Sequence, residues 1–125
     1  MYISIFSDSC FYRARQKFYK ANSIGWCARP PHKKDVFLRK GQFKKASNMN
    51  YCLDFSIRVE DKLLSLLAEH EQQFPEEEIT VAKENELYDI AMKEIIDSDE
   101  GRTWADGNVR LGEIILLLDC DTKVV

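Results

Sequence analysis

Two carboxylates follow an aliphatic run near the end of the sequence. The run from Ile114 to Leu118 leads directly into Asp119, Cys120 and Asp121. Carboxylate oxygens are the ligands that Mg²⁺ and Mn²⁺ prefer, and such a cation can bridge diphosphate oxygens and neutralise a leaving group. The structural alternative is that an aspartate after a strand caps the next helix. Taken alone, the pair favours that alternative.

A second candidate is the basic and amide-rich segment Lys-Lys-Ala-Ser-Asn-Met-Asn over 44–50. Lys45 supplies a positive charge for phosphate, and a helix that starts here offers unpaired N–H groups to an anion. Asn48 and Asn50 are two residues apart, so on a helix they point to different sides. One could face a ligand while the other caps or packs. The alternative is a basic loop before an ordinary helix.

The third candidate is Arg29, which precedes Pro30 at the end of a predicted strand. A guanidinium group can bind phosphate with two parallel hydrogen bonds. An exposed arginine without a ligand is the commoner case. Each of the three signals is weak by itself, and their order along the chain gives them more weight together.

Alternating elements are predicted to position these residues. Apolar periodicity indicates helices, and short apolar runs bounded by turn residues indicate strands. The aliphatic run before Asp119 is typical of a central strand that is buried on both faces. The pattern predicts an α/β layer fold. Strands are expected over 1–8, 24–29 and 113–119, and helices over 11–21, 46–56, 59–72 and 84–96.

Charge is distributed unevenly along the chain. Between Arg13 and Lys45 there are 11 basic residues and one acid, whereas 60–100 holds 14 acids and three bases. The acidic part is expected to be a solvated helical surface. The basic part could face an anion, but nucleic acid is not expected, because Phe37 and Phe43 are the only aromatics interleaved with its loop.

Cysteine usage and hydropathy exclude other classes. None of the four cysteines forms a Cys-x-x-Cys pair, which argues against a zinc site and for reduced thiols in the cytosol. No signal peptide opens the sequence, and no apolar run is long enough for a membrane span. His32 and His70 have no neighbouring histidine or cysteine and receive no role.

The combined order of Arg-Pro, basic loop, KASNMN, helices, apolar strand and Asp-x-Asp resembles glycosyltransferase family 2. Within that family it is most similar to the cellulose synthase-like, fungal-type branch. KASNMNYCL is similar to that branch's Lys-Ala-Gly-Asn-Leu-Asn motif, with Ser47 and Met49 as departures. GEIILLLDCDTKV is similar to its strand and Asp-x-Asp. The resemblance covers about 24–124, and 57–100 is interpreted as a helical acidic insertion.

The resemblance implies an incomplete GT-A (Rossmann-like) fold that binds a UDP-sugar donor. By that resemblance, Asp119 and Asp121 hold a divalent metal, Mg²⁺ or Mn²⁺, and Asp119 also lies near the ribose. Arg29, Lys45, Asn48 and Asn50 line the nucleotide-sugar pocket. The implied reaction is metal-dependent transfer of a hexose to a polysaccharide acceptor. Full-length members are membrane-embedded with a cytosolic catalytic domain, and this chain is expected in the cytosol.

Three parts of the family pattern are not found in residues 1–125. These are the first uridine-binding strand, the acidic base motif that follows Asp-x-Asp, and the Gln-x-x-Arg-Trp acceptor motif. A metal site without a base cannot deprotonate an acceptor hydroxyl. The sequence therefore predicts a donor-binding fragment, with no catalytic residue assigned and no activity of its own. The alternative is a non-catalytic nucleotide-sugar-binding or interaction remnant.

Overall fold

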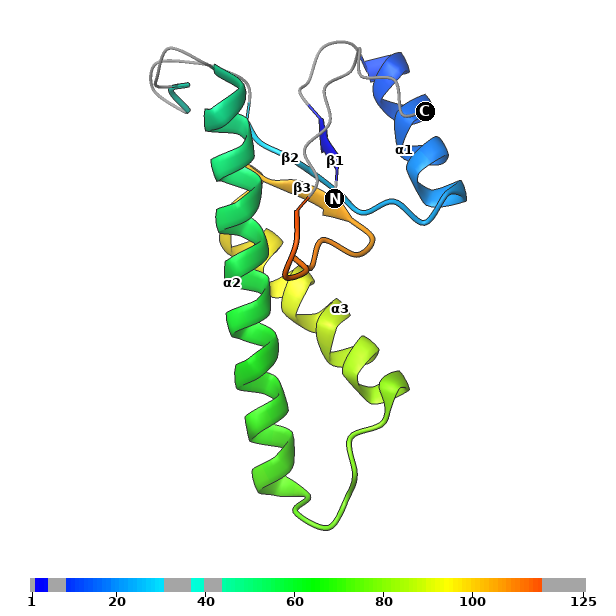
Figure 1. The fold of residues 1–125 in the computed structure, drawn as a ribbon, viewed down its shortest axis with the longest axis vertical. Helices are drawn as coiled ribbons and strands as arrows, with labels where there is room; N and C mark the ends of the chain where they lie inside the picture. Colours follow the sequence, from blue (N-terminus) through cyan, green and yellow to red (C-terminus); the bar gives the residue numbers. More distant parts are fainter. Residues whose placement is uncertain (1, 5–8, 31–36, 40–43, 116–125) are drawn as a thin grey trace.

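The computed structural model of the chain describes residues 2–4, 9–30, 37–39 and 44–115. Figure 1 shows the longest helix, α2, running along the molecule, with α3 beside it and a small sheet between α2 and α1. The order of elements is β1 (Tyr2–Ser4), α1 (Ser9–Ala21), β2 (Trp26–Ala28), α2 (Lys44–Gln73), α3 (Val81–Ser98) and β3 (Trp104–Asp106).

The predicted fold class, an α/β incomplete GT-A (Rossmann-like) fold, is wrong. The described residues are mostly helical: the helices have 13, 30 and 18 residues, whereas each strand has 3. A Rossmann-like sheet is mostly parallel and carries helices on both faces. Here β2 pairs in parallel with β1 and antiparallel with β3. The main core therefore lies between helices, and the sheet is an addition to it.

The buried strand predicted over 113–119 does not form in its described part. Residues 113–115 have no strand pairing, and Ile114 is 90% exposed. The remainder of that prediction lies outside the described residues. Periodicity cannot establish a buried strand from a short apolar run, because such a run has no polar face that would fix its surroundings.

Helix α2 joins two segments that were predicted as separate helices, 46–56 and 59–72. It continues for 30 residues because neither glycine nor proline interrupts it before Pro75. Its buried positions keep a helical spacing along one face, so a single stripe enters the core. Those positions include Cys52, Phe55, Val59 and Leu63. Among the described residues, no helix is both long enough and apolar enough to cross a bilayer.

Helix α3 packs along α2 and completes the core. Its start is fixed by Thr80, whose hydroxyl accepts a hydrogen bond of 3.2 Å from the backbone N–H of Lys83. The apolar stripe of α3 faces that of α2 and contains Leu87, Tyr88, Ala91 and Met92. The helix predicted over 84–96 is thus confirmed and extends beyond both predicted ends.

The two faces of the sheet have different neighbours. Trp26 is opposite Asp106, and Ala28 is opposite Trp104, so these four side chains share one face. Cys27 lies between Trp26 and Ala28 on β2, so its side chain points to the opposite face, into the core formed by α2 and α3. Tyr19 of α1 packs with Trp26 and Ala28 on the first face. The sheet therefore separates a small cluster under α1 from the main core.

The early elements follow the sequence prediction. β1, α1 and β2 lie within or close to the predicted ranges. Helix α1 ends at Ala21, the predicted last residue, and Ser23 beyond it takes a left-handed conformation with φ of 53°. No strand was predicted between 29 and 113, but β3 forms there and includes Trp104. The prediction missed this strand because it has only 3 residues.

Candidate functional site

The structure brings Arg29 and Asn48 into direct contact. The Nε atom of Arg29 donates a hydrogen bond of 2.5 Å to Oδ1 of Asn48, and its Nη1 donates one of 2.5 Å to the carbonyl oxygen of Pro30. Arg29 follows β2, whereas Asn48 lies near the start of α2. Two of the predicted site residues, 19 positions apart, therefore meet at one place.

Arg29 is a buried cation whose described hydrogen-bond partners are neutral. It is 2% exposed, and its guanidinium carbon lies 5.1 Å from the centre of the Phe37 ring. Burial and then the positive charge of Arg39 lower the pKa of Arg29. A buried charge needs compensation. Neutral acceptors and an aromatic face provide part of it, and an added anion would provide more.

The other members of the predicted set are placed less fully. Lys45 is in the first turn of α2, but its side chain lies outside the described part of the structure. Asn50 is exposed on α2, whereas Asn48 is buried, which confirms that the two point to different sides. Asp119 and Asp121 lie outside the described residues. Within the described ranges, no group of three or more histidine, cysteine or acidic residues could hold a metal.

A small hollow lies next to Arg29. It has a volume of about 160 Å³ and shares Pro30 and Phe37 with the surroundings of Arg29. The rings of Phe37 and Tyr51 form one aromatic wall, edge to face with their centres 5.3 Å apart. We call this cavity the arginine hollow. Its lining consists of Pro30, Phe37, Tyr51, Arg58, Asp99 and Arg102.

A connected set of polar side chains forms the far wall of the arginine hollow. Arg58 binds both carboxylate oxygens of Asp99, with Nη1 to Oδ1 at 2.7 Å and Nη2 to Oδ2 at 3.0 Å. The hydroxyl of Thr103 donates to Asp99 and also pairs with the hydroxyl of Tyr51. The wall therefore joins α2, the end of α3 and the residues before β3.

The ionisation of these groups determines what the arginine hollow can do. Burial acts to raise the pKa of Asp99, but the hydrogen bonds from Arg58 and Thr103 outweigh it, and the net pKa is below its usual value. Burial raises the pKa of Tyr51. At neutral pH, Asp99 is thus ionised and the Tyr51 hydroxyl is protonated. Neither group is suited to accept a proton as a general base.

The balance of charge favours a small anion. Arg29, Arg58 and Arg102 surround the arginine hollow or adjoin it, against Asp99 in its wall and Asp54 beside Arg58. Guanidinium groups match phosphate and carboxylate oxygens in geometry as well as in charge. The arrangement can therefore bind an anion and place a flat group against Phe37 or Tyr51.

The wall of the arginine hollow was not predicted from the sequence. Arg58 and Asp54 carry a visible signal, since opposite charges four apart pair on a helix. Asp99 and Thr103 were not predicted, because Arg58 and Tyr51, which link them to α2, are 41 and 52 residues away. Tyr51 lies within the KASNMN helix, but its ring could not be assigned to a site without the loop that holds Phe37.

Two of the cysteines are buried in the main core. Cys27 and Cys52 are both free and fully buried, and the Cys52 thiol donates to the backbone oxygen of Cys27 at 3.7 Å. Hydrogen bonding with Cys52 and burial raise the pKa of Cys27 far above its usual value. A protonated buried thiol is a poor nucleophile and a poor metal ligand. These residues therefore act as core packing.

Comparisons of the chain with protein-family models, with curated proteins and with solved structures gave no match.

Proposed function

We propose that this chain supplies donor-binding residues of a metal-dependent hexosyltransferase that uses a UDP-sugar and extends a polysaccharide acceptor. The motifs shared with glycosyltransferase family 2 support the proposal. The corrected fold removes the Rossmann-type sheet as an argument for it. The proposal therefore stands on the residues of the site and on the chemistry they can perform.

The contact between Arg29 and Asn48 carries the proposal. It joins the Arg-Pro and KASNMN segments, both of which were assigned to the nucleotide-sugar pocket from sequence. Buried Arg29 has neutral described partners and lies beside the first turns of α2, where helix N–H groups favour an anion. A diphosphate placed at Arg29 would be next to the aromatic wall of the arginine hollow.

The other assigned residues complete this proposal. Asp119 and Asp121 would hold Mg²⁺ or Mn²⁺, which would offset charge on the departing UDP. Lys45 and Asn50 would contact the donor from the same helix as Asn48. Donor binding, and not transfer, is assigned to this chain, because the acidic base motif of the family pattern is not found in residues 1–125.

Calorimetry with UDP and Mn²⁺ tests the proposal on the purified chain. We expect saturable heat that requires both components and disappears in Asp121→Asn. Asn48→Asp places an internal carboxylate on Arg29, so it should weaken UDP binding at least ten-fold while the helical circular dichroism is retained. Asp89→Asn, an exposed carboxylate change on α3, is the matched control and should bind as the wild type does.

Three results would contradict the proposed donor site. No heat with UDP at any Mn²⁺ concentration would exclude donor binding. Unchanged binding in Asn48→Asp would show that UDP binds away from Arg29. A loss of binding in Asp89→Asn equal to that in Asp121→Asn would show that the effect of charge is general.

A non-catalytic interaction module is the second candidate function. Ile57 and Leu64 are exposed on α2 and seven residues apart, so they lie on the same side of that helix, away from its packed stripe. Exposed apolar residues on one helix face suit helix–helix association. If this candidate is correct, light scattering should find an oligomer that Ile57→Ser with Leu64→Ser converts to a monomer, and UDP should give no heat.

A further inference from the structure

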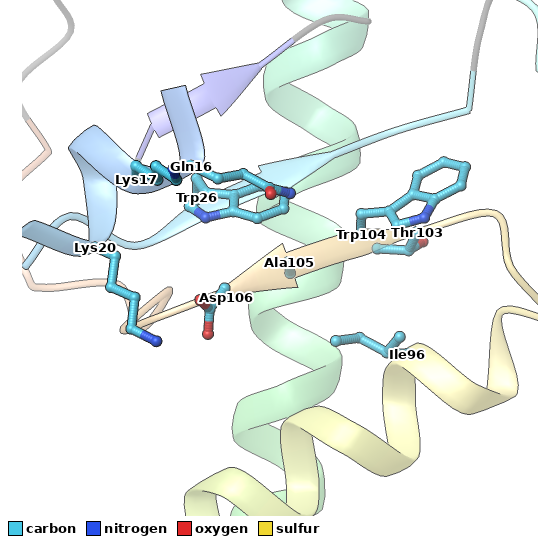
Figure 2. A pocket seen from close by; sticks show the side chains of 9 residues that line it. All are labelled: Gln16, Lys17, Lys20, Trp26, Ile96, Thr103, Trp104, Ala105 and Asp106. Carbon is cyan, nitrogen blue, oxygen red and sulfur yellow. The ribbon is translucent and has the colours of Figure 1, made fainter. Parts of the chain in front are cut away.

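A second hollow, of different chemistry, lies along β3. It has a volume of about 500 Å³, within the range of small-molecule sites. Figure 2 shows side chains of α1 above it, β3 along its middle and Ile96 of α3 at its lower edge. We call it the tryptophan hollow. Its lining is Gln16, Lys17, Lys20, Trp26, Ile96, Thr103, Trp104, Ala105 and Asp106.

The sequence places both of its tryptophans in this hollow. The chain has 2 tryptophans, and both Trp26 and Trp104 line it. Trp26 is 5% exposed and packs under α1, whereas Trp104 is 38% exposed. The antiparallel register puts both indoles on the same face of the sheet. The hollow therefore has a fixed aromatic floor and a second indole that is open to solvent.

Hydrogen-bond donors and acceptors both surround the indoles. Lys17 and Lys20 lie on one side of α1, three residues apart, and the Gln16 amide precedes them. Asp106 is opposite Trp26 on the neighbouring strand and contributes a carboxylate. Figure 2 shows Lys20 and Asp106 at one end of the hollow and Trp104 at the other. Donors and acceptors are thus mixed around an aromatic centre.

We propose that the tryptophan hollow binds a short carbohydrate chain. Sugar rings have apolar C–H faces that pack on indoles, and hydroxyl groups that both donate and accept hydrogen bonds. Asp106 and Gln16 accept from hydroxyls, while Lys17 and Lys20 donate to them. This combination of a large aromatic surface and a few mixed polar groups is what a neutral polar ligand requires.

A nucleic-acid strand fits the same lining less well. Indoles can stack on bases, but phosphates require an unopposed positive surface. Asp106 opposes the two lysines here, and no arginine is among the described residues that line this hollow. Arg58 and Arg102 line the arginine hollow instead. The charge pattern therefore favours a carbohydrate.

The proposal is independent of the donor site at Arg29. Its ligand is different, and the side chains that would bind that ligand are different; Thr103 alone belongs both to this lining and to the wall of the arginine hollow. In a transferase, such a site would hold the acceptor glycan, but its own test requires no transfer. Either proposal can fail while the other holds.

Tryptophan fluorescence provides the test, because both emitting residues line this hollow. The full chain is titrated with a β-1,4-linked glucose hexasaccharide and, separately, with oligouridylate. We expect a saturable change in emission with the glucan that is almost independent of salt, and none with oligouridylate. Calorimetry on Trp104→Ala should show a loss of affinity of about ten-fold, the size of one aromatic contact.

Matched variants guard against unfolding and general surface effects. Lys20→Ala changes an exposed helical residue and should weaken glucan binding a few-fold with the fold intact. Lys83→Ala lies in the first turn of α3, at the opposite end of that helix from Ile96, and Phe74→Ala changes an exposed residue outside this lining. Both variants should leave the affinity unchanged. The proposal is overturned if the glucan leaves emission and heat unchanged. It is also overturned if Trp104→Ala and Lys20→Ala both bind as the wild type, or if only oligouridylate binds, with a steep salt dependence.

Discussion

Arg58 and Asp99 form a two-point ion pair that joins the middle of α2 to the end of α3. The two N–O distances are 2.7 and 3.0 Å, and the residues are 41 positions apart. Asp99 is the C-terminal cap of α3, and Thr103 also donates to it. This pair therefore orients the connector that leads into β3 and the wall of the arginine hollow.

Asp99→Asn should lower the free energy of unfolding by about 1–3 kcal/mol, since it removes one charge from a largely buried, hydrogen-bonded pair. Partial exposure of Arg58 places the value toward the lower end. Urea denaturation followed by circular dichroism measures it. Asp97→Asn breaks an exposed pair with Lys93 and should leave the urea midpoint almost unchanged. Equal losses in the two variants would contradict a special role for Asp99.

The same pair predicts a dependence of stability on pH. The pKa of folded Asp99 lies below its usual value of 3.8, because hydrogen bonds from Arg58 and Thr103 outweigh burial. A carboxyl with a lowered folded-state pKa contributes stability above its unfolded-state pKa and loses it as the pH falls through the folded value. The stability difference between wild type and Asp99→Asn should therefore shrink below pH 3.8. A difference that stays constant into acid would disprove this origin.

Replacing Leu63 by alanine should destabilise the α2–α3 core, whereas the same change at its neighbour Leu64 should not. Leu63 is 0% exposed within the core, whereas its neighbour Leu64 is 56% exposed. Leu63→Ala should lower the free energy of unfolding by about 2–5 kcal/mol, because it removes buried apolar area and leaves a cavity. Leu64→Ala should change it by less than about 0.5 kcal/mol. Similar losses at both positions would mean that α2 packs on a different face.

The helices were more predictable from sequence than the sheet, for a physical reason. The stripe through Phe55, Val59 and Leu63 recurs at helical spacing, which is a local signal that sequence carries directly. β3 has 3 residues and forms because its backbone pairs with β2, where Asp106 is opposite Trp26, 80 positions earlier. Such pairing leaves almost no local pattern. The α/β prediction failed because the described helices α2 and α3 pack on each other, and the sheet beside them is short and mixed in direction.

The candidate site was predictable to the extent that its residues are close in sequence to a recognisable motif. Arg29 and Asn48 were named from their segments, and the structure joins them. Asp99 was not named. In the sequence it cannot be distinguished from the solvated acids around it, and only the structure places Arg58 beside it. Long-range pairing selects one acid among many, and sequence alone does not contain that selection.

Gly25 should be intolerant of any side chain, because two backbone segments meet there. A Cβ atom at this position would lie 1.8 Å from the backbone oxygen of Asn108, and no rotamer change can relieve that contact. Gly25→Ala should therefore lower the free energy of unfolding by about 3 kcal/mol or more. Gly112→Ala is the control: its Cβ would have its nearest neighbour at 3.7 Å and should cost less than about 0.5 kcal/mol. A thermal melt that shifts equally for both would contradict the close approach.

Tyr88 should hold the segment after β3 against α3 through its hydroxyl. That oxygen accepts a hydrogen bond of 2.9 Å from the buried N–H of Val109 and donates one of 3.1 Å to the carbonyl oxygen of Gly107. Tyr88→Phe keeps the ring but leaves the Val109 N–H without its acceptor, which should cost about 1–3 kcal/mol. Hydrogen exchange by NMR should show faster exchange at the Val109 amide than at other core amides. Ser65→Ala removes an exposed hydroxyl that contacts Glu69 and serves as the control, with no change expected at Val109. Unchanged protection of that amide in Tyr88→Phe would show that the hydroxyl does not hold this segment in place.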